Sequence, residues 1–152
     1  MEKIITIMMV LAVSFIGCKK DEVLPLPDQE GNIALRNVKS LSLIKKTIRG
    51  NWKIHYMYGG FTGNTRIDLQ NSWFKYMSND SMYIIDEGRI WAATIPTFYR
   101  AQTVFGFEAW VMDYEVGLGV SDRMYFYGLQ KDTLVMGRPT VEPYHFYMTR
   151  FP

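Results

Sequence analysis

The hydrophobic and polar positions of this chain repeat with two different periods. Within residues 38–48, Leu41, Ile44 and Ile48 recur three and four positions apart, which predicts one short amphipathic helix. Gly50 follows at a place where helices commonly end. After it, aromatic and β-branched residues dominate, and turn-forming residues interrupt them at short intervals. The pattern therefore predicts an all-β body preceded by one helix.

The alternation predicts seven to nine antiparallel strands joined by short turns. The pair Asn79-Asp80 and the runs 86–88 and 130–132 consist of residues that suit hairpin turns. Consecutive hairpins form an up-and-down meander, and closing the meander into a barrel removes its exposed edges. We predict a small closed barrel over residues 37–152, with strands near 52–58, 72–77, 81–85, 89–95, 103–116 (as one bent strand or two), 123–129, 133–136 and 144–150.

A barrel of about eight strands is either filled by side chains or just wide enough for one small ligand. The chain has 10 Met, 10 Tyr, 9 Phe and 4 Trp, which suit an adaptable apolar cavity and equally suit a packed core, so both alternatives stay open. Strand alternation from Trp52 leaves Met57 on the outer face. The predicted wall of a cavity, if one exists, is Tyr56, Phe74, Met82, Trp91, Trp110, Tyr125, Phe146 and Met148.

The N-terminal residues have a different pattern, that of an export signal. The apolar run from Ile4 to Ile16 is too short to cross a hydrocarbon core of roughly 30 Å comfortably, so residues 1–17 are predicted to be a signal peptide. Cys18 is the only cysteine, which excludes a disulfide within the chain. The residues up to Gly17-Cys18 resemble the lipobox of bacterial lipoproteins, although Phe15 replaces the usual leucine. This resemblance implies an acylated Cys18 that holds the protein to a lipid bilayer.

Residues 18–36 are predicted to be a flexible tether, because they are charged at first and then contain Pro25, Pro27 and Gly31. A lysine followed by acidic residues directly after Cys18 is similar to the surface-export signal of some Gram-negative lipoproteins. The two resemblances together imply an outer-membrane lipoprotein. They leave open whether the domain is periplasmic or surface-exposed.

A second resemblance concerns the barrel itself. A short helix followed by Gly50-x-Trp52 at the head of the first strand is similar to the start of lipocalin-like domains. Residues 132–136 and 144–150 resemble the closing strands of the bacterial lipoprotein branch of that family, in which the last strand ends in an arginine. The resemblance implies that Gly50, Trp52 and Arg150 form the barrel floor. There Arg150 would pack over the indole by a cation–π contact of about 0.5 to 2 kcal/mol.

Charge and candidate chemistry narrow the function classes. The formal net charge of +2, without a basic and aromatic face, argues against nucleic acid as a partner. His55 and His145 are the only histidines and lack a third metal ligand, so no metal site is predicted and both are expected on the outer face or the rim. Asp113 and Glu115 are expected to be solvent-exposed rather than a catalytic pair. No catalytic residue and no cofactor are predicted.

These observations support one leading hypothesis and one alternative. The leading hypothesis is a membrane-anchored, non-enzymatic lipoprotein that binds a small hydrophobic or amphipathic molecule inside a lipocalin-like barrel. The alternative is an envelope interaction module, with a side-chain-filled barrel, that contacts another protein or a glycan. An enzymatic role has the least support.

Overall fold

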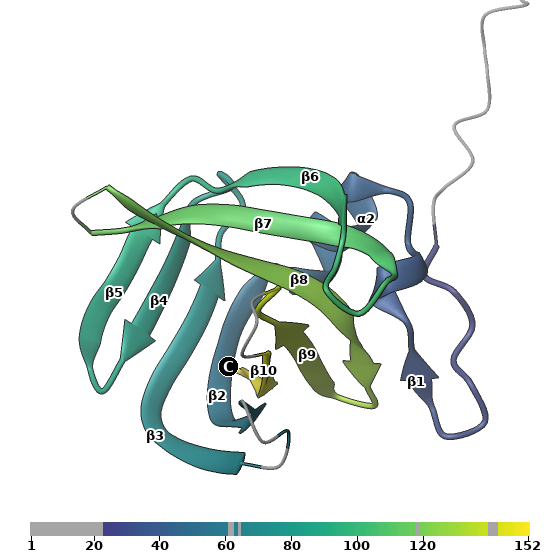
Figure 1. The fold of residues 1–152 in the computed structure, drawn as a ribbon, viewed down its shortest axis with the longest axis horizontal. Coiled ribbons are helices and arrows are strands. Elements are labelled where there is room, and N and C mark those ends of the chain that lie inside the picture. Colours follow the sequence, from purple (N-terminus) through teal and green to yellow (C-terminus); the bar gives the residue numbers. More distant parts are fainter. Residues whose placement is uncertain (1–22, 61–62, 64, 118, 140–142) are drawn as a thin grey trace, which may run out of the picture.

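The computed structural model describes residues 23–60, 63, 65–117, 119–139 and 143–152, so the predicted signal peptide and Cys18 lie outside it (Figure 1). A 3-10 helix η1 (Leu35–Asn37) and an α-helix α2 (Leu41–Ile48) come early in the chain. The strands are β1 (Asn32–Ile33), β2 (Gly50–Gly59), β3 (Thr65–Tyr76), β4 (Met82–Asp86), β5 (Arg89–Thr94), β6 (Thr97–Gln102), β7 (Glu108–Val116), β8 (Val120–Gln130), β9 (Thr133–Gly137) and β10 (Tyr144–Phe151).

All the strands belong to one antiparallel sheet that curls into a half-barrel. Its order is β5-β4-β3-β2-β10-β9-β8-β7-β6, and β1 is added beside β8. The meander therefore pairs its early strand β2 with its last strand β10, with Trp52 opposite Arg150. The predicted all-β class with one short α-helix is confirmed. Figure 1 shows β6 and β7 running crosswise above β3, β4 and β5.

The closed barrel expected from the sequence differs from this curled half-barrel. Among the residues that the structure describes, no ladder joins β5 to β6, the two edges of the sheet, and β5 contacts β7 instead. Only Ile95 and Pro96 separate the two strands. Because proline has no N–H to donate to a ladder, the chain leaves the sheet there rather than forming a hairpin.

Helix α2 covers one end of the half-barrel. Ser40 caps it by accepting a hydrogen bond from the Leu43 backbone N–H at 3.3 Å, so the helix begins later than the predicted residue 38. Its buried face packs into the core. On the other side, the Lys45 ammonium donates to Asp80 at 2.6 Å and lowers the pKa of that carboxyl, with a further contribution from the Tyr76 hydroxyl. This contact ties the helix to the turn between β3 and β4.

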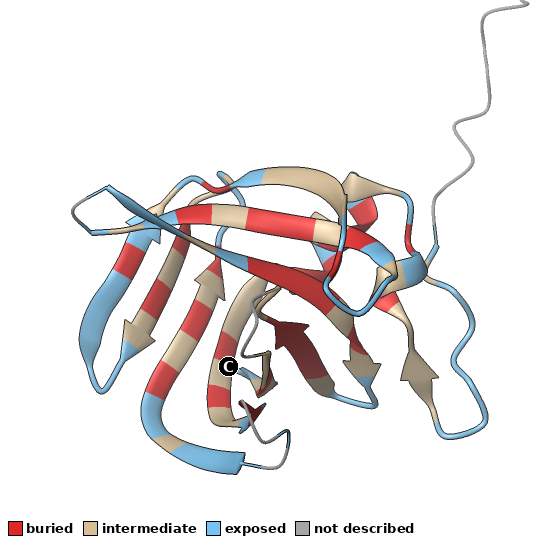
Figure 2. Ribbon diagram, in the orientation of Figure 1, coloured by how far each residue is buried: buried red, intermediate tan, exposed pale blue. Residues whose placement is uncertain are grey.

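The main core lies on the inner face of the curl, where buried and exposed residues alternate along the strands (Figure 2). The predicted turns are confirmed, because Asp80, Glu87 and Lys131 all adopt positive φ between paired strands. The buried inner side chains include Trp52, Ile54, Phe74, Tyr76, Met82, Ile84, Met112, Tyr114, Met124, Phe126, Leu134, Met136, Phe146 and Met148.

The predicted strand 103–116 is wrong in its first part. A separate strand β6 (Thr97–Gln102) precedes a turn, in which Thr103 N–H donates to the Phe107 carbonyl at 2.8 Å and Gly106 has φ of 80°. Strand β7 begins only at Glu108. The apolar residues of the turn gave it the appearance of a strand, although Phe105 is 47% exposed.

The predicted tether also ends earlier than expected. β1 pairs with β8, and Leu35 in η1 is fully buried, so residues 32–36 belong to the folded domain. The Arg36 guanidinium lies over the rings of Phe107 and Tyr127, at 5.2 and 5.1 Å from their centroids. These cation–π contacts and the short ladder hold the segment against the outer face of the sheet.

A β-bulge reverses the expected faces in the second half of β2. The register shifts against β10, where Ile54 pairs with Met148 and Tyr56 with Tyr147, which leaves His55 as an extra residue. Met57, predicted to point outward, packs against the inner core. Tyr56, predicted to line a cavity, is instead stacked on Tyr147 with ring centroids 4.6 Å apart.

Candidate ligand-binding site

One end of the half-barrel is closed by Trp52, which is 2% exposed. Its Nε1–H donates to the Ile48 carbonyl at 2.7 Å, and the Arg150 guanidinium lies 4.6 Å from the centre of the indole. Arg150 also donates to the carbonyls of Arg49 at 2.9 Å and Thr47 at 3.0 Å. A cation is favourable there because these carbonyls form the negative end of α2.

Gly50 lies beside Arg150 at the same end of the half-barrel. Its φ is 130°, and a Cβ at this position would lie 2.9 Å from Nη1 of Arg150. The structure thus brings Gly50, Trp52 and Arg150, the three predicted floor residues, into one contact group.

The half of the interior next to this floor is filled with side chains. Three of the predicted wall residues, Phe74, Met82 and Met148, are buried there as core residues with at most 1% exposure. Phe98 packs between Tyr76 and Phe126, with centroid distances of 6.0 and 6.2 Å. Side chains therefore pack the interior beside the floor.

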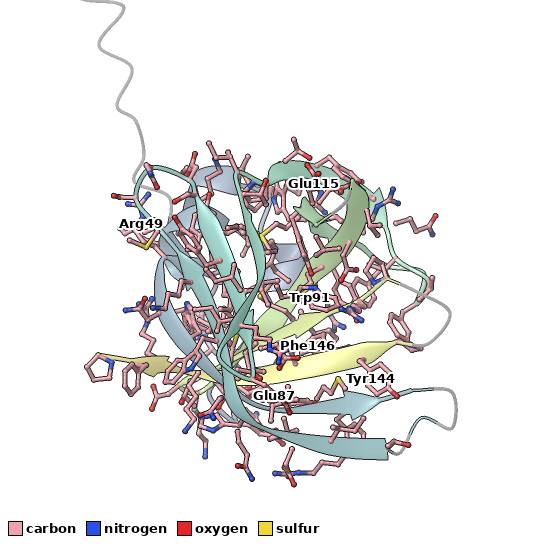
Figure 3. The ribbon with its side chains drawn as sticks, turned by 90° about the vertical axis from the view of Figure 1, so that its left-hand side faces the viewer. Arg49, Glu87, Trp91, Glu115, Tyr144 and Phe146 are labelled. Atoms are coloured by element: carbon pink, nitrogen blue, oxygen red, sulfur yellow. The ribbon has the colours of Figure 1, made fainter. Side chains whose placement is uncertain are left out.

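The other half of the interior contains a mainly apolar cavity of about 240 Å³. That volume is slightly below the roughly 300–1,000 Å³ of pockets that hold drug-sized ligands. Figure 3 looks from the β5 side, and Trp91 and Phe146 lie near the centre of this view. The lining consists of Ile54, Met57, Leu69, Ser72, Ile84, Ile85, Asp86, Trp91, Tyr114, Met124, Arg138 and Phe146. Of the predicted wall residues, Trp91 and Phe146 therefore line the cavity.

A second bulge explains the position of Trp91. Ile84 pairs with Ala92 and Ile85 with Ile90, so Trp91 is the extra residue of β5. Bulges commonly redirect a side chain beside a binding site. The indole lines the cavity although it is 52% exposed, which places it at the boundary between the cavity and solvent.

Arg138 places a charged group in the cavity wall. Its Nη2 donates to Asp122 at 2.8 Å, and its guanidinium lies 5.6 Å from the centre of the Phe146 ring. Tyr114 donates its hydroxyl to the same Asp122 at 3.2 Å. Burial, and then the negative charge of Asp122, raise the pKa of Tyr114 well above its usual value, so this phenol stays protonated.

One hydrogen-bond donor of Arg138 is unused. Its Nε is buried and has no acceptor within the described part of the chain. An unsatisfied buried donor costs about 1–3 kcal/mol. On another wall of the cavity, Ser72 donates its hydroxyl to Asp86 at 2.5 Å. The cavity thus combines apolar walls with two polar positions, an arrangement that suits an amphipathic molecule.

Tyr125 and Trp110, also predicted wall residues, lie elsewhere. Tyr125 belongs to a second hydrophobic cluster, and its hydroxyl is hydrogen-bonded to Nε2 of His145 at 2.6 Å. A Cβ at Gly137 would lie within 2.4 Å of the Tyr125 ring, so only glycine leaves room for it. Trp110 is partly buried against the inner core, near the Arg100 guanidinium at 5.8 Å.

This second cluster forms an aromatic surface on the outer face of the sheet. It surrounds a hollow of about 450 Å³, and burial there lowers the pKa of His145. Sequence alternation predicts His145 on the outer face or the rim. It does not predict the rings around it, because Phe105 lies in a turn whose apolar residues resemble a strand. The surface is lined by Arg36, Phe105, Phe107, Tyr127, Gln130, Val135, His145 and Tyr147.

A third hollow, of about 720 Å³, lies where the N-terminal segment crosses the floor. Val23, Leu24, Lys46 and Lys131 are among its lining residues, together with the outer parts of Trp52 and Arg150. It is larger than the interior cavity, and part of its wall is a single extended segment that includes Val23 and Leu24. Strands of the sheet form most of the wall of the interior cavity, which is therefore the better candidate for a small ligand.

Two of the remaining polar candidates, Asp113 and His55, contact other side chains. Asp113 is half-buried and forms an ion pair with Arg123 at 3.2 Å, which differs from the solvent exposure expected for it, whereas Glu115 is exposed. His55 is hydrogen-bonded to Thr149 at 2.8 Å. The residues that the structure describes include no group of three or more His, Cys, Asp or Glu side chains positioned to hold a metal ion.

Comparisons with known proteins found no relatives of this chain. No family model, no curated protein and no solved structure matches the chain. In the described ranges, neither η1 nor α2 has the length and apolar character needed to span a membrane. The case for the cavity therefore rests on its geometry.

Proposed function

We propose that this protein is a lipid-anchored, non-enzymatic binding protein that holds a small hydrophobic or amphipathic molecule in its interior cavity. The observation that carries the proposal is the uneven filling of the half-barrel. Side chains fill the half beside Trp52, while a cavity of about 240 Å³ remains in the other half. Its apolar walls and its polar groups at Asp86 and Arg138 suit a ligand of mixed character.

The proposal includes the lipocalin-like resemblance. The contacts of Gly50, Trp52 and Arg150 support it, since they form the closed end that the resemblance implies. A complete barrel would require β5 and β6 to pair. We propose that β5 and β6 pair in solution and complete the barrel.

The proposed location follows from Cys18. Acylation there would hold the domain to the outer membrane of a Gram-negative bacterium, on the periplasmic or the outer side. Cys18→Ser expressed in such a host should accumulate as uncleaved precursor or as protein released from membranes. Fully processed, membrane-bound Cys18→Ser would contradict the anchor without bearing on the cavity.

Binding can be tested with N-phenyl-1-naphthylamine, a small neutral probe whose fluorescence increases in apolar surroundings. The purified domain should bind the probe, and Trp91→Ala should weaken binding. Ile90→Ala is a matched control, because Ile90 is a neighbouring apolar residue of β5 that is 67% exposed and does not line the cavity. Absence of binding to the unaltered protein, or equal effects of the two variants, would contradict the cavity as the site.

The outer aromatic surface supports one second candidate, an interaction module that contacts another envelope protein or a glycan. Phe105 is 47% exposed beside the ring of Tyr125, and such a patch suits an interface. Native mass spectrometry of protein purified from its host separates the two functions. A bound small molecule supports the cavity, whereas a stoichiometric protein partner without a small molecule supports the interaction module.

A further inference from the structure

Arg138, the cation in the lining of the cavity, already has a partner of opposite sign. It is paired with Asp122 at 2.8 Å. The other charged group of the lining, Asp86, is an anion that accepts the Ser72 hydroxyl. The described lining therefore offers no unpaired positive charge to an approaching anion.

The surroundings of Asp122 strengthen this balance. Its carboxylate accepts the Tyr114 hydroxyl at 3.2 Å and the backbone N–H of Arg123 at 2.8 Å, in addition to the Arg138 guanidinium. These three donors hold the negative charge in place, where the Asp122 side chain is 18% exposed. A ligand anion that approached Arg138 would also approach Asp122. Repulsion by that fixed carboxylate would offset much of the attraction by the arginine.

Arg138 nevertheless keeps hydrogen-bonding capacity. Asp122 accepts from Nη2, about a third of the side chain (34%) is exposed, and Nε has no acceptor among the described residues. A neutral oxygen, such as that of an ester, ketone or alcohol, accepts from a guanidinium without bringing a charge that Asp122 would repel.

We propose that the cavity selects a neutral amphipathic ligand, with an apolar body and an uncharged acceptor oxygen bound by Arg138, over the corresponding carboxylate. This inference rests on the proposed function and specifies its ligand class. The Asp122–Arg138 pair is then the specificity determinant: Arg138 orients the oxygen, and Asp122 excludes the anion.

Competition against N-phenyl-1-naphthylamine at pH 7.5 tests the inference with three molecules of similar size: methyl octanoate, octanoate and octane. The unaltered protein should bind methyl octanoate about tenfold more tightly than octanoate, as expected when one fixed like charge opposes the anion. Arg138→Met should remove the advantage of methyl octanoate over octane. Octane itself should bind to both proteins, since it needs only the apolar walls.

Asp122→Asn is the decisive variant, because it keeps the shape of the side chain while leaving Arg138 without its counter-charge. Octanoate should then bind about tenfold more tightly than it does to the unaltered protein. Asp113→Asn is the matched control, since Asp113 forms its own ion pair with Arg123 on the same hairpin but does not line the cavity. It should leave the preference for the ester unchanged.

The outcomes separate this inference from the proposed function. If the unaltered protein binds the probe and octane but prefers octanoate or does not distinguish it from the ester, the selectivity is refuted and the cavity stands. An unchanged ester preference in folded Asp122→Asn, checked by its melting temperature, would refute the role of the ion pair. If the unaltered protein does not bind the probe at all, the proposed function and this inference both fail.

Discussion

Trp52 is the residue with the most specific set of contacts. Its indole is 2% exposed, donates to the Ile48 carbonyl and lies under the Arg150 guanidinium. The contacts join the end of α2 to the first and last strands of the half-barrel. Removing the ring should therefore affect the stability of the whole domain rather than that of one element.

Trp52→Ala should lower the free energy of unfolding by about 3–5 kcal/mol, the range for large aromatic side chains removed from a core. Urea denaturation followed by circular dichroism measures it. Trp91→Ala is the control with the same chemical change, and it should cost far less because Trp91 is 52% exposed. Equal losses in the two variants would contradict the central position assigned to Trp52.

His145 should make the stability of the domain depend on pH. Burial disfavours the charged imidazolium and lowers the pKa of His145 in the folded protein, while the unfolded chain keeps a value near 6.5. Between these two values the unfolded state binds more protons. The stability is then complete above about pH 6.5 and decreases as the pH falls toward the folded pKa.

Melting temperatures measured between pH 7.5 and 4.5 test this dependence. His145→Gln should flatten the decrease below pH 6.5, and His55→Gln, which changes the other histidine, should retain it. The carboxyl of Asp80 titrates below its usual value of 3.8, outside this interval. A decrease that persists unchanged in His145→Gln would show that another group is responsible.

At the scale of elements, sequence alternation works where strands are regular and fails at bulges. In β10, alternation correctly predicted that Phe146 and Met148 share the inner face. In β2, His55 is an extra residue relative to β10, and it exchanges the faces of Tyr56 and Met57. Nothing in the residue type of His55 marks a bulge, because bulges are set by pairing with neighbouring strands. The cavity wall was therefore predictable only in part.

Apolar turns caused the second kind of error. Val104 and Phe105 continue the apolar pattern into β7, yet they are 58% and 47% exposed in a turn. A short apolar run does not distinguish a buried strand from a turn that packs on another surface. The same limitation hid the outer aromatic surface. Its members come from η1, this turn and three strands, which only the fold brings together.

The docking of β1 on β8 depends on Gly128. A Cβ at that position would lie 2.7 Å from the backbone oxygen of Ile33. Gly128→Ala should therefore displace β1, and hydrogen exchange of Ile33 should become faster while the strands of the half-barrel stay protected. Ser121→Ala, an exposed position at the start of the same strand, should leave β1 in place. Unchanged protection of β1 in Gly128→Ala would contradict the close approach.

For the molecule as a whole, the most consequential feature is that β5 and β6, the two edges of the sheet, are not paired. The pairing of β2 with β10 protects the two strands that would otherwise be the ends of the meander, and the edges fall in the middle of the chain instead. Edge strands expose unpaired N–H and C=O groups. The strand pattern predicted an antiparallel meander, which the curled half-barrel confirms. Closure of that meander is not seen in the described part of the chain, because pairing between β5 and β6 depends on the path of the chain at Pro96 and has no signature in strand alternation.

Hydrogen exchange of the whole domain distinguishes an open half-barrel from a closed barrel. In the open form, edge amides in β5 and β6 should exchange at least about tenfold faster than amides in the central strands β2 and β10, because they open without unfolding the core. Adding methyl octanoate should slow exchange in β5 if the ligand contacts Trp91. Protection of β5 and β6 equal to that of β2 would instead indicate that the sheet closes in solution.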